Sequence, residues 1–227
     1  ASGSAASAGC DLVRSFILPA PSSSSLSKSL SNSSSSDGLG GLGSAFDSAG
    51  FGSLSSAMLS CPTKHVVSIA PQMTIEVLIP DFKLSLDSLR VVTESGPDII
   101  AHNVETVPSL YRSVRQGSGY RSSLDVLDVI KKMTPSLKTK SGIMLGLGEK
   151  EAEVIAVMGD LRAVECDFLS IGQYLAPSKL HYPVKEYITL EQFAYYREKA
   201  LSMGFSHVES GPYVRSSYMA GEYLSRT

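Results

Sequence analysis

From residue 73 onward, apolar and polar residues alternate with two periodicities that indicate strands and amphipathic helices. Runs rich in Val, Ile and Leu predict strands at residues 73–80, 97–105, 139–148, 166–175 and 207–212. Between them, apolar positions recur with helical spacing at residues 86–95, 107–114, 123–133, 149–165 and 190–204. Such alternation predicts an α/β fold with a parallel sheet and right-handed crossovers, forming part of a (β/α) barrel with too few strands to close. The first of these strands would be an open edge, which predicts marginal solubility or pairing with another chain.

The composition changes near residue 62. Before it, stretches such as PSSSSLSKSLSNSSSSDGLGG are rich in Ser and Gly and bury too little apolar area to offset their chain entropy. We therefore expect a disordered low-complexity segment over residues 1–61 and a folded region over residues 62–227, with a helical turn at the apolar residues 12–18. A Ser-rich, acid-poor start is also typical of a transit peptide, which would place the protein in a mitochondrion or plastid, and otherwise in the cytoplasm. A fragment or an aberrant start is the competing interpretation.

Charge and cysteine content exclude several classes of function. The 227 residues carry a formal net charge of −2, so there is no basic field for nucleic acid and no polybasic patch for a membrane. No apolar run approaches the roughly 20 residues that span a bilayer. Cys10, Cys61 and Cys166 are odd in number and widely spaced, which favours a reducing compartment and predicts no metal site from neighbouring thiolates.

Polar residues gather where each expected strand ends, in PDF, HNVET, GLGEKE, GQYLAPS and SGPYVRSSY. Since ligands of parallel α/β folds bind beyond the carboxyl ends of the strands, these clusters predict a site on one rim. The individual signals stay open: Asn103 and Glu105 are either a binding cluster or a hydrogen-bonded strand end, and Gln173 either lines the site or caps a turn. The GLGE turn either receives an anion at a helix start or is a close-packed turn.

In chain order, these stretches resemble lipoyl synthase, a family of radical S-adenosylmethionine enzymes. The matching segments are VLIPDF, HNVETVPSLYRSVR, TKSGIMLGLGE, VMGDLR, IGQYLAPSKLHYPV, MGF and SGPYVRSSY, over about residues 70–224. The resemblance implies a partial barrel with two 4Fe–4S clusters, which inserts two sulfur atoms into an octanoyl chain carried on lysine. The implied partners are octanoylated lipoyl-domain proteins or a glycine-cleavage H-type protein.

The resemblance also implies roles for single residues. In the family, a CxxxCxxC loop holds the cluster that cleaves S-adenosylmethionine, and a serine of RSSY binds the cluster that supplies sulfur. This assigns Ser217 as an oxygen ligand to iron, with Ser216 as the alternative, and Arg215 as an anchor of the C-terminal segment. Three rim residues become candidates to contact S-adenosylmethionine or substrate: Asn103, Glu105 and Gln173.

The chain also departs from the family pattern. The family carries its two triple-cysteine motifs upstream of IPDF, where this chain holds only Cys10 and Cys61, and Leu84 stands in place of a glycine. Cys166 is then a small packed residue. We therefore expect no activity from this chain alone, as an incomplete or misassembled lipoyl synthase. The alternatives are a degenerate half-barrel that binds a lipoyl-domain protein or has no function, and a phosphate-binding α/β enzyme that uses GLGE.

Overall fold

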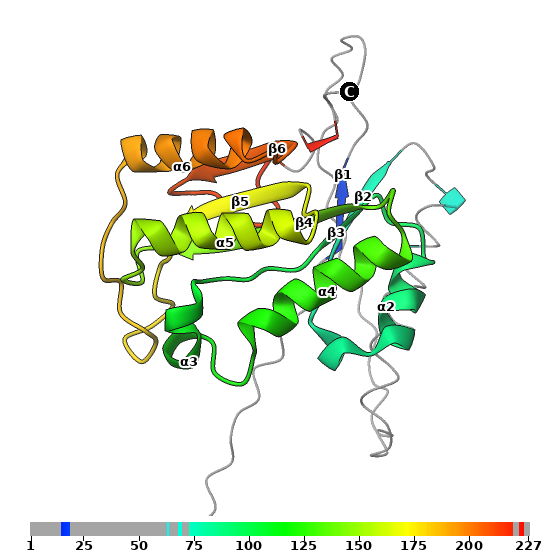
Figure 1. The fold of residues 1–227 in the computed structure, drawn as a ribbon, viewed down its shortest axis with the longest axis horizontal. Helices are drawn as coiled ribbons and strands as arrows, with labels where there is room; N and C mark the ends of the chain where they lie inside the picture. The colour runs from blue at the N-terminus through cyan, green and yellow to red at the C-terminus, as the bar shows by residue number, and fades with distance from the viewer. Residues whose placement is uncertain (1–14, 19–62, 64–67, 70–72, 220–222, 225–227) are drawn as a thin grey trace, which may run out of the picture.

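One mixed sheet forms the centre of the structure (Figure 1). The computed structural model describes residues 15–18, 63, 68–69, 73–219 and 223–224. The strands are β1 Ser15–Leu18, β2 Thr74–Leu78, β3 Ile99–Ala101, β4 Lys138–Leu145, β5 Phe168–Gln173 and β6 His207–Gly211, adjacent in that order. Strands β2 to β6 are parallel and β1 is antiparallel to β2. The predicted α/β fold with five parallel strands is confirmed.

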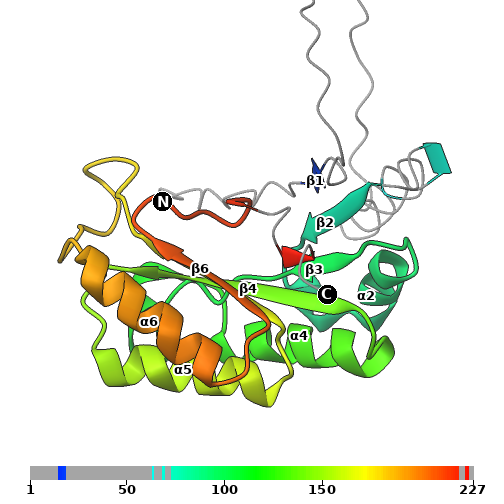
Figure 2. The same ribbon diagram turned by 90° about the horizontal axis from the view of Figure 1, so that it is seen from above.

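The helices cover one face of the sheet, and the chain after β6 lies on the other (Figure 2). They are α2 Leu86–Thr93, α3 Tyr111–Val114, α4 Tyr120–Met133, α5 Glu151–Ala163 and α6 Leu190–Ser202, with short turns η1 Phe82–Leu84 and η2 Pro108–Leu110. None of these helices in the described stretches is long and apolar enough to cross a bilayer. The two layers place the apolar core between the sheet and α2, α4, α5 and α6.

Alternation along each strand separates the two faces of the sheet. Leu169 and Ile171 of β5 are fully buried in the core beneath the helices. Their neighbours Phe168 and Ser170 instead contact Tyr223. Tyr223 belongs to the C-terminal segment, the described residues that follow β6. The face without helices is therefore covered by the chain's own C-terminal residues.

Two predictions about the start of the chain are wrong. Ser15–Leu18 pairs antiparallel with β2, from Ser15 opposite Val77 to Leu18 opposite Thr74, so β2 is not the open edge that the sequence predicted. The same residues form a strand rather than a helical turn, because their alternative partner lies far along the chain and local pattern carries no sign of it. The rest of the expected disordered segment lies outside the described residues, and the boundary at residue 62 stays a prediction.

Asp167 lies just ahead of β5, at the end of the sheet where the parallel strands begin. Its Oδ2 lies 2.6 Å from Lys131 Nζ and accepts a bond from the Thr139 amide at 2.9 Å, and its Oδ1 lies 3.1 Å from Lys138 Nζ. Burial opposes the charge of this carboxylate, but the bonds from Lys131, Thr139 and Lys138 together outweigh burial. The pKa of Asp167 therefore lies below its usual range.

We expect Asp167→Asn to lower the free energy of unfolding near neutral pH by about 2–4 kcal/mol, because the Lys131 side chain, 8% exposed, keeps an uncompensated charge. A carboxyl with a depressed pKa contributes stability above its unfolded pKa, and this is lost as pH falls through the folded pKa. Urea unfolding of both proteins should thus show the difference in unfolding free energy narrowing as the pH falls below the usual aspartate pKa of about 4. Asp87→Asn is the control, since its exposed pair with Arg90 should contribute less than about 1 kcal/mol. A gap that is constant with pH would contradict this assignment.

Candidate functional site

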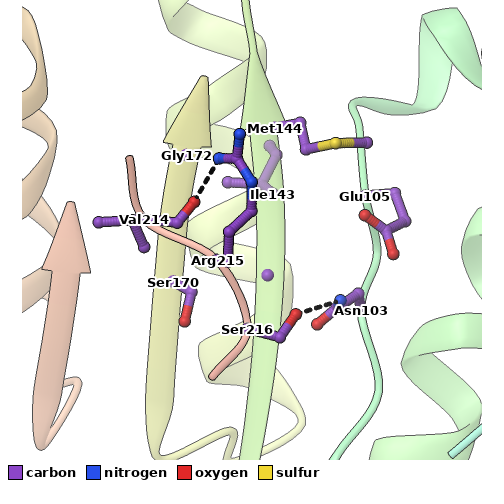
Figure 3. Close-up of a pocket in the computed structure, with 10 residues that line it drawn as sticks. Asn103, Glu105, Ile143, Met144, Ser170, Gly172, Val214, Arg215 and Ser216 are labelled. Atoms are coloured by element: carbon purple, nitrogen blue, oxygen red, sulfur yellow. Dashed lines mark hydrogen bonds between the residues drawn. The ribbon is translucent and has the colours of Figure 1, made fainter. Parts of the chain in front are cut away.

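A cavity of about 190 Å³ lies toward the carboxyl ends of β4 and β5, beneath the segment that follows β6 (Figure 3). Its floor is formed by small and apolar positions of these strands, Gly142, Met144 and Gly172 among them. Asn103 and Glu105, after β3, form one wall, and the C-terminal segment forms the opposite one. Of the predicted rim, residues of HNVET, GQYLAPS and SGPYVRSSY line this cavity, whereas PDF and GLGEKE are not among its described lining residues.

Asn103 and Glu105 reach this cavity because β3 ends at Ala101, earlier than predicted. The chain rejoins β4 where the Glu105 amide donates to the Gly142 carbonyl at 2.9 Å and the Met144 amide donates to the Glu105 carbonyl at 2.8 Å. Glu105 has a φ of 66°, in the left-handed region that residues other than glycine rarely adopt. Such backbone is held only where the surroundings fix it, and it is common at functional sites.

The RSSY stretch lies across the mouth of the cavity. Asn103 Nδ2 donates to Ser216 Oγ at 2.9 Å, which joins the end of β3 to the C-terminal segment (Figure 3). Ser216 lines the cavity, whereas Ser217 is half-buried and is not among the described lining residues. The assignment of the iron ligand to Ser217 stays a prediction, and Ser216 is the serine that the structure brings beside Asn103.

Arg215 links the same segment to the end of β5. Its Nη1 donates to the Val214 carbonyl at 2.7 Å and lies 3.5 Å from the Gln173 carbonyl oxygen. The side chain runs beside Gly172, where a Cβ would collide with the Val214 carbonyl oxygen. Only a glycine at this position of β5 lets the segment lie so close to the sheet.

The Gln173 side chain forms most of its hydrogen bonds with the loop between β5 and α6. Its Nε2 donates to the carbonyls of Leu145, Tyr174 and Glu186 at 3.0–3.2 Å, and its Oε1 accepts from the Ile188 amide at 3.0 Å. The side chain is buried, and these bonds match the turn-capping interpretation that the sequence left open. Contact of Gln173 with a ligand stays a prediction.

Sequence reasoning missed three residues that support the site. Arg115 Nη1 donates to the Asn103 carbonyl at 2.8 Å, and Lys140 Nζ lies 3.0 Å from Glu76 Oε2 on the face without helices. Lys140 and Glu76 are almost completely buried, so burial lowers the pKa of Lys140 and raises that of Glu76. A sequence signal was available for Glu76 and Lys140, because each is a charged residue inside a buried strand, TIEVL or KTKSGIML.

The described residues do not fit a 4Fe–4S cluster, which cysteine thiolates hold. Cys166 is the free cysteine there; it is buried ahead of β5, and its Sγ lies 3.4 Å from the Phe168 carbonyl oxygen. Burial raises the pKa of its thiol to about 12, which disfavours the thiolate and matches the predicted packing role. In the described part of the chain, no three His, Cys, Asp or Glu side chains gather to hold a metal ion. Cys10 and Cys61 lie outside it.

The GLGE turn has its amides occupied by the chain's own carboxylates. Glu149 accepts bonds from the amides of Gly146 and Leu147 at 2.6 and 2.9 Å. Glu153 accepts from the Lys150 amide at the start of α5 at 2.8 Å. A phosphate would have to displace these carboxylates, so the geometry favours the close-packed turn over the anion site.

Comparisons with known proteins give consistent relatives, although no family model matches the chain. Lipoyl synthase from Citrifermentans bemidjiense is 57% identical over 160 residues, which are 70% of this chain and 55% of the relative. Lipoyl synthase from Geotalea daltonii is 52% identical over 171 residues, 75% of this chain and 58% of the relative. The same enzyme from Geotalea uraniireducens is 59% identical over 154 residues, 68% and 54% of the two chains. The chain thus spans about half the length of the curated relatives it matches.

The close approach at Gly172 predicts opposite effects for two glycine substitutions. Gly172→Ala should lower the free energy of unfolding by about 1–3 kcal/mol, because its Cβ forces the backbone of the C-terminal segment away from β5. Gly159→Ala, within α5, has only Met203 Cε at 3.7 Å and should raise stability by up to about 1 kcal/mol through helix propensity. Urea unfolding of both variants measures the difference, and an unchanged stability in Gly172→Ala would show that the segment does not lie on β5.

Proposed function

Because the chain belongs to the lipoyl synthase family as a partial member, we propose that its cavity is the acyl-binding part of a lipoyl synthase site. The reaction proposed for the whole site is the insertion of two sulfur atoms into an octanoyl chain on a lysine, dependent on S-adenosylmethionine. The partners proposed are octanoylated lipoyl-domain proteins or a glycine-cleavage H-type protein. The observation that carries the proposal is the hydrogen bond between Asn103 and Ser216, which holds RSSY over the cavity.

The lining of the cavity suits a saturated acyl chain with a polar end. Gly142, Met144, Gly172 and Val214 offer apolar surface and close backbone approach, and Glu105 adds a carboxylate at the wall. The C-terminal segment covers part of this floor, and such cover would limit the water that a carbon radical meets. These residues bind and shield the chain and do not themselves transfer sulfur.

The volume of the cavity favours an octanoyl chain over whole S-adenosylmethionine as its ligand. At about 190 Å³ it is smaller than the roughly 300–1,000 Å³ of typical cofactor pockets. We propose that an acyl chain enters it with the C-terminal segment in place, whereas whole S-adenosylmethionine needs space beyond the cavity. We therefore place the acyl chain against β4 and β5. A cationic group of S-adenosylmethionine would lie toward Glu105 and Asn103.

The iron–sulfur clusters belong to the proposed function of the family and not to a step derived for this chain. The described residues lack the thiolates that would hold them, so we propose that the chain alone does not form the lipoyl group. An oxygen donor from Ser217, or from Ser216 as the alternative, is a harder ligand to iron than a thiolate and would release iron more easily. A mitochondrial or plastid location stays a proposal that rests on residues 1–61.

A second function follows from the same cavity. Its described lining residues include no cysteine, so we propose that it receives an octanoyl chain without any cluster. The chain would then act as a binding module for octanoylated proteins. Binding and sulfur insertion differ in their need for iron, which allows them to be separated.

Calorimetric titration with an octanoyl-lysine peptide tests the acyl site, with the acetyl-lysine form of the same peptide as reference. We expect the octanoyl peptide to bind more tightly, and Met144→Trp to weaken its binding by about tenfold or more, a loss of about 1.4 kcal/mol, by filling the cavity. Met133→Trp is the matched control, because Met133 packs against the core at α4 away from the cavity. Equal binding of both peptides, or equal effects of both substitutions, would contradict the proposal.

Anaerobic reconstitution with iron and sulfide tests whether this chain alone carries a cluster. We expect no bound iron and no broad visible absorbance, because Cys166 is buried and ahead of β5. A stable cluster would show that the inactivity proposal is wrong. In that case Ser217→Ala and Ser216→Ala, compared by the rate of iron loss, would identify the oxygen ligand.

A further inference from the structure

The ammonium of Lys140 lies at the centre of the sheet face that carries no helices. Both oxygens of Glu76 accept from its Nζ, at 3.2 and 3.0 Å, and the carbonyl oxygen of Ser216 accepts a further bond. The ring of Tyr223 lies over the same Nζ, with 3.8 Å to its centroid. An ammonium has three donors. Here its surroundings are Glu76 and two parts of the C-terminal segment.

Tyr223 is fixed as firmly as the ammonium it covers. Its hydroxyl is 3.0 Å from Ser170 Oγ, and its ring packs edge-on against Phe168 and His207, with centroids 5.2 and 4.6 Å away. The residue is 5% exposed. The chain after β6 is therefore bound to the sheet at two points: within RSSY through the Ser216 carbonyl, and beyond RSSY through Tyr223.

Another buried ion pair among the described residues serves as a comparison. Lys131 and Asp167 are also largely buried, but their partners are strand and helix residues at the other end of the sheet. Replacing a buried ion pair by apolar residues is often neutral for stability, so burial alone does not explain a lysine in β4. What distinguishes Lys140 is that its contacts beyond Glu76 reach the segment over the cavity.

We propose that Lys140 is a positioning residue that holds the segment from Val214 to Tyr218 across the cavity mouth. Its bond to the Ser216 carbonyl fixes the backbone of that residue. Ser216 Oγ is thereby placed within reach of Asn103. Glu76 keeps the ammonium in place from β2, and the Tyr223 ring closes it off from solvent. The proposal deepens the function proposed above, since the serine oxygen it places is the one that borders the acyl cavity.

Hydrogen exchange of the full chain, without any ligand, tests this role. In Glu76→Leu/Lys140→Met the pair is replaced by apolar side chains, so no carboxylate is left unpaired in the interior. We expect the amides of the segment, such as Tyr218, which is bonded to the Arg215 carbonyl at 2.8 Å, to exchange about tenfold to a hundredfold faster. Amides of β5 in the same sample are the internal reference and should change little.

Lys131→Met/Asp167→Asn is the matched control, because it removes a buried pair that does not touch the segment. It should leave the exchange of the segment relative to β5 as in the wild type. Equal acceleration in both double variants, or none in Glu76→Leu/Lys140→Met, would overturn the proposal.

Two single variants keep the test decisive if the first double variant does not fold. Tyr223→Leu removes the ring over Lys140 and should accelerate exchange of the segment, whereas Tyr223→Phe keeps the ring and should stay closer to wild type. The same rate in both would contradict a role for the ring. Because exchange is measured without peptide or iron, its failure is distinct from a failure of acyl binding in the titration.

Discussion

The structure depends on how the second face of its sheet is covered. Helices α2, α4, α5 and α6 pack on one face, and a parallel sheet is stable only when both faces are shielded. Among the described residues, the other face bears Glu76, Lys140 and Ser170, polar groups that need partners when buried. The C-terminal segment supplies them through the Ser216 carbonyl and the Tyr223 side chain. The same contacts that satisfy the sheet therefore build one wall of the cavity.

In this arrangement the same contacts stabilise the fold and shape the cavity. Gly172 permits close approach of the segment, Asn103 bonds to it from β3, and Arg215 ties it to the end of β5. These contacts lie at the ends of β3 and β5, and the segment that they hold forms one wall of the cavity. The matched residues cover 55% of the relative from Citrifermentans bemidjiense, and the acyl-binding role is proposed on the part that the structure describes.

Much of the fold follows from local pattern, and the remaining features come from distant contacts. Apolar runs and helical spacing gave the parallel strands and the rim, because these depend on neighbours in sequence. The pairing of β1 with β2 involves residues about sixty positions apart, and no local signal in SFIL indicates it. β3 ends early, at Ala101, and the chain after it includes the left-handed backbone of Glu105, which its side chain alone does not predict.

The sequence predicted which residues lie around the cavity better than it predicted the contacts of each side chain. Asn103, Glu105 and Arg215 lie around the cavity as the rim argument requires. Gln173 shares the strand end, but its side chain bonds to Leu145 at the end of β4 and to three groups of the loop after β5, an arrangement that local sequence does not indicate. Ser216 and Ser217 are neighbours with identical chemistry, and a turn of the backbone decides which of them borders the cavity.

The central claim is that the chain after β6 lies across the cavity and meets the end of β3. Thiol crosslinking measures this directly, in Asn103→Cys/Ser216→Cys with Cys10 and Cys61 replaced by serine. The Asn103 amide and the Ser216 hydroxyl are 2.9 Å apart, so a short bifunctional thiol reagent should join the two introduced cysteines within one chain. Peptide mapping that finds both cysteines modified but not joined to each other would contradict the account.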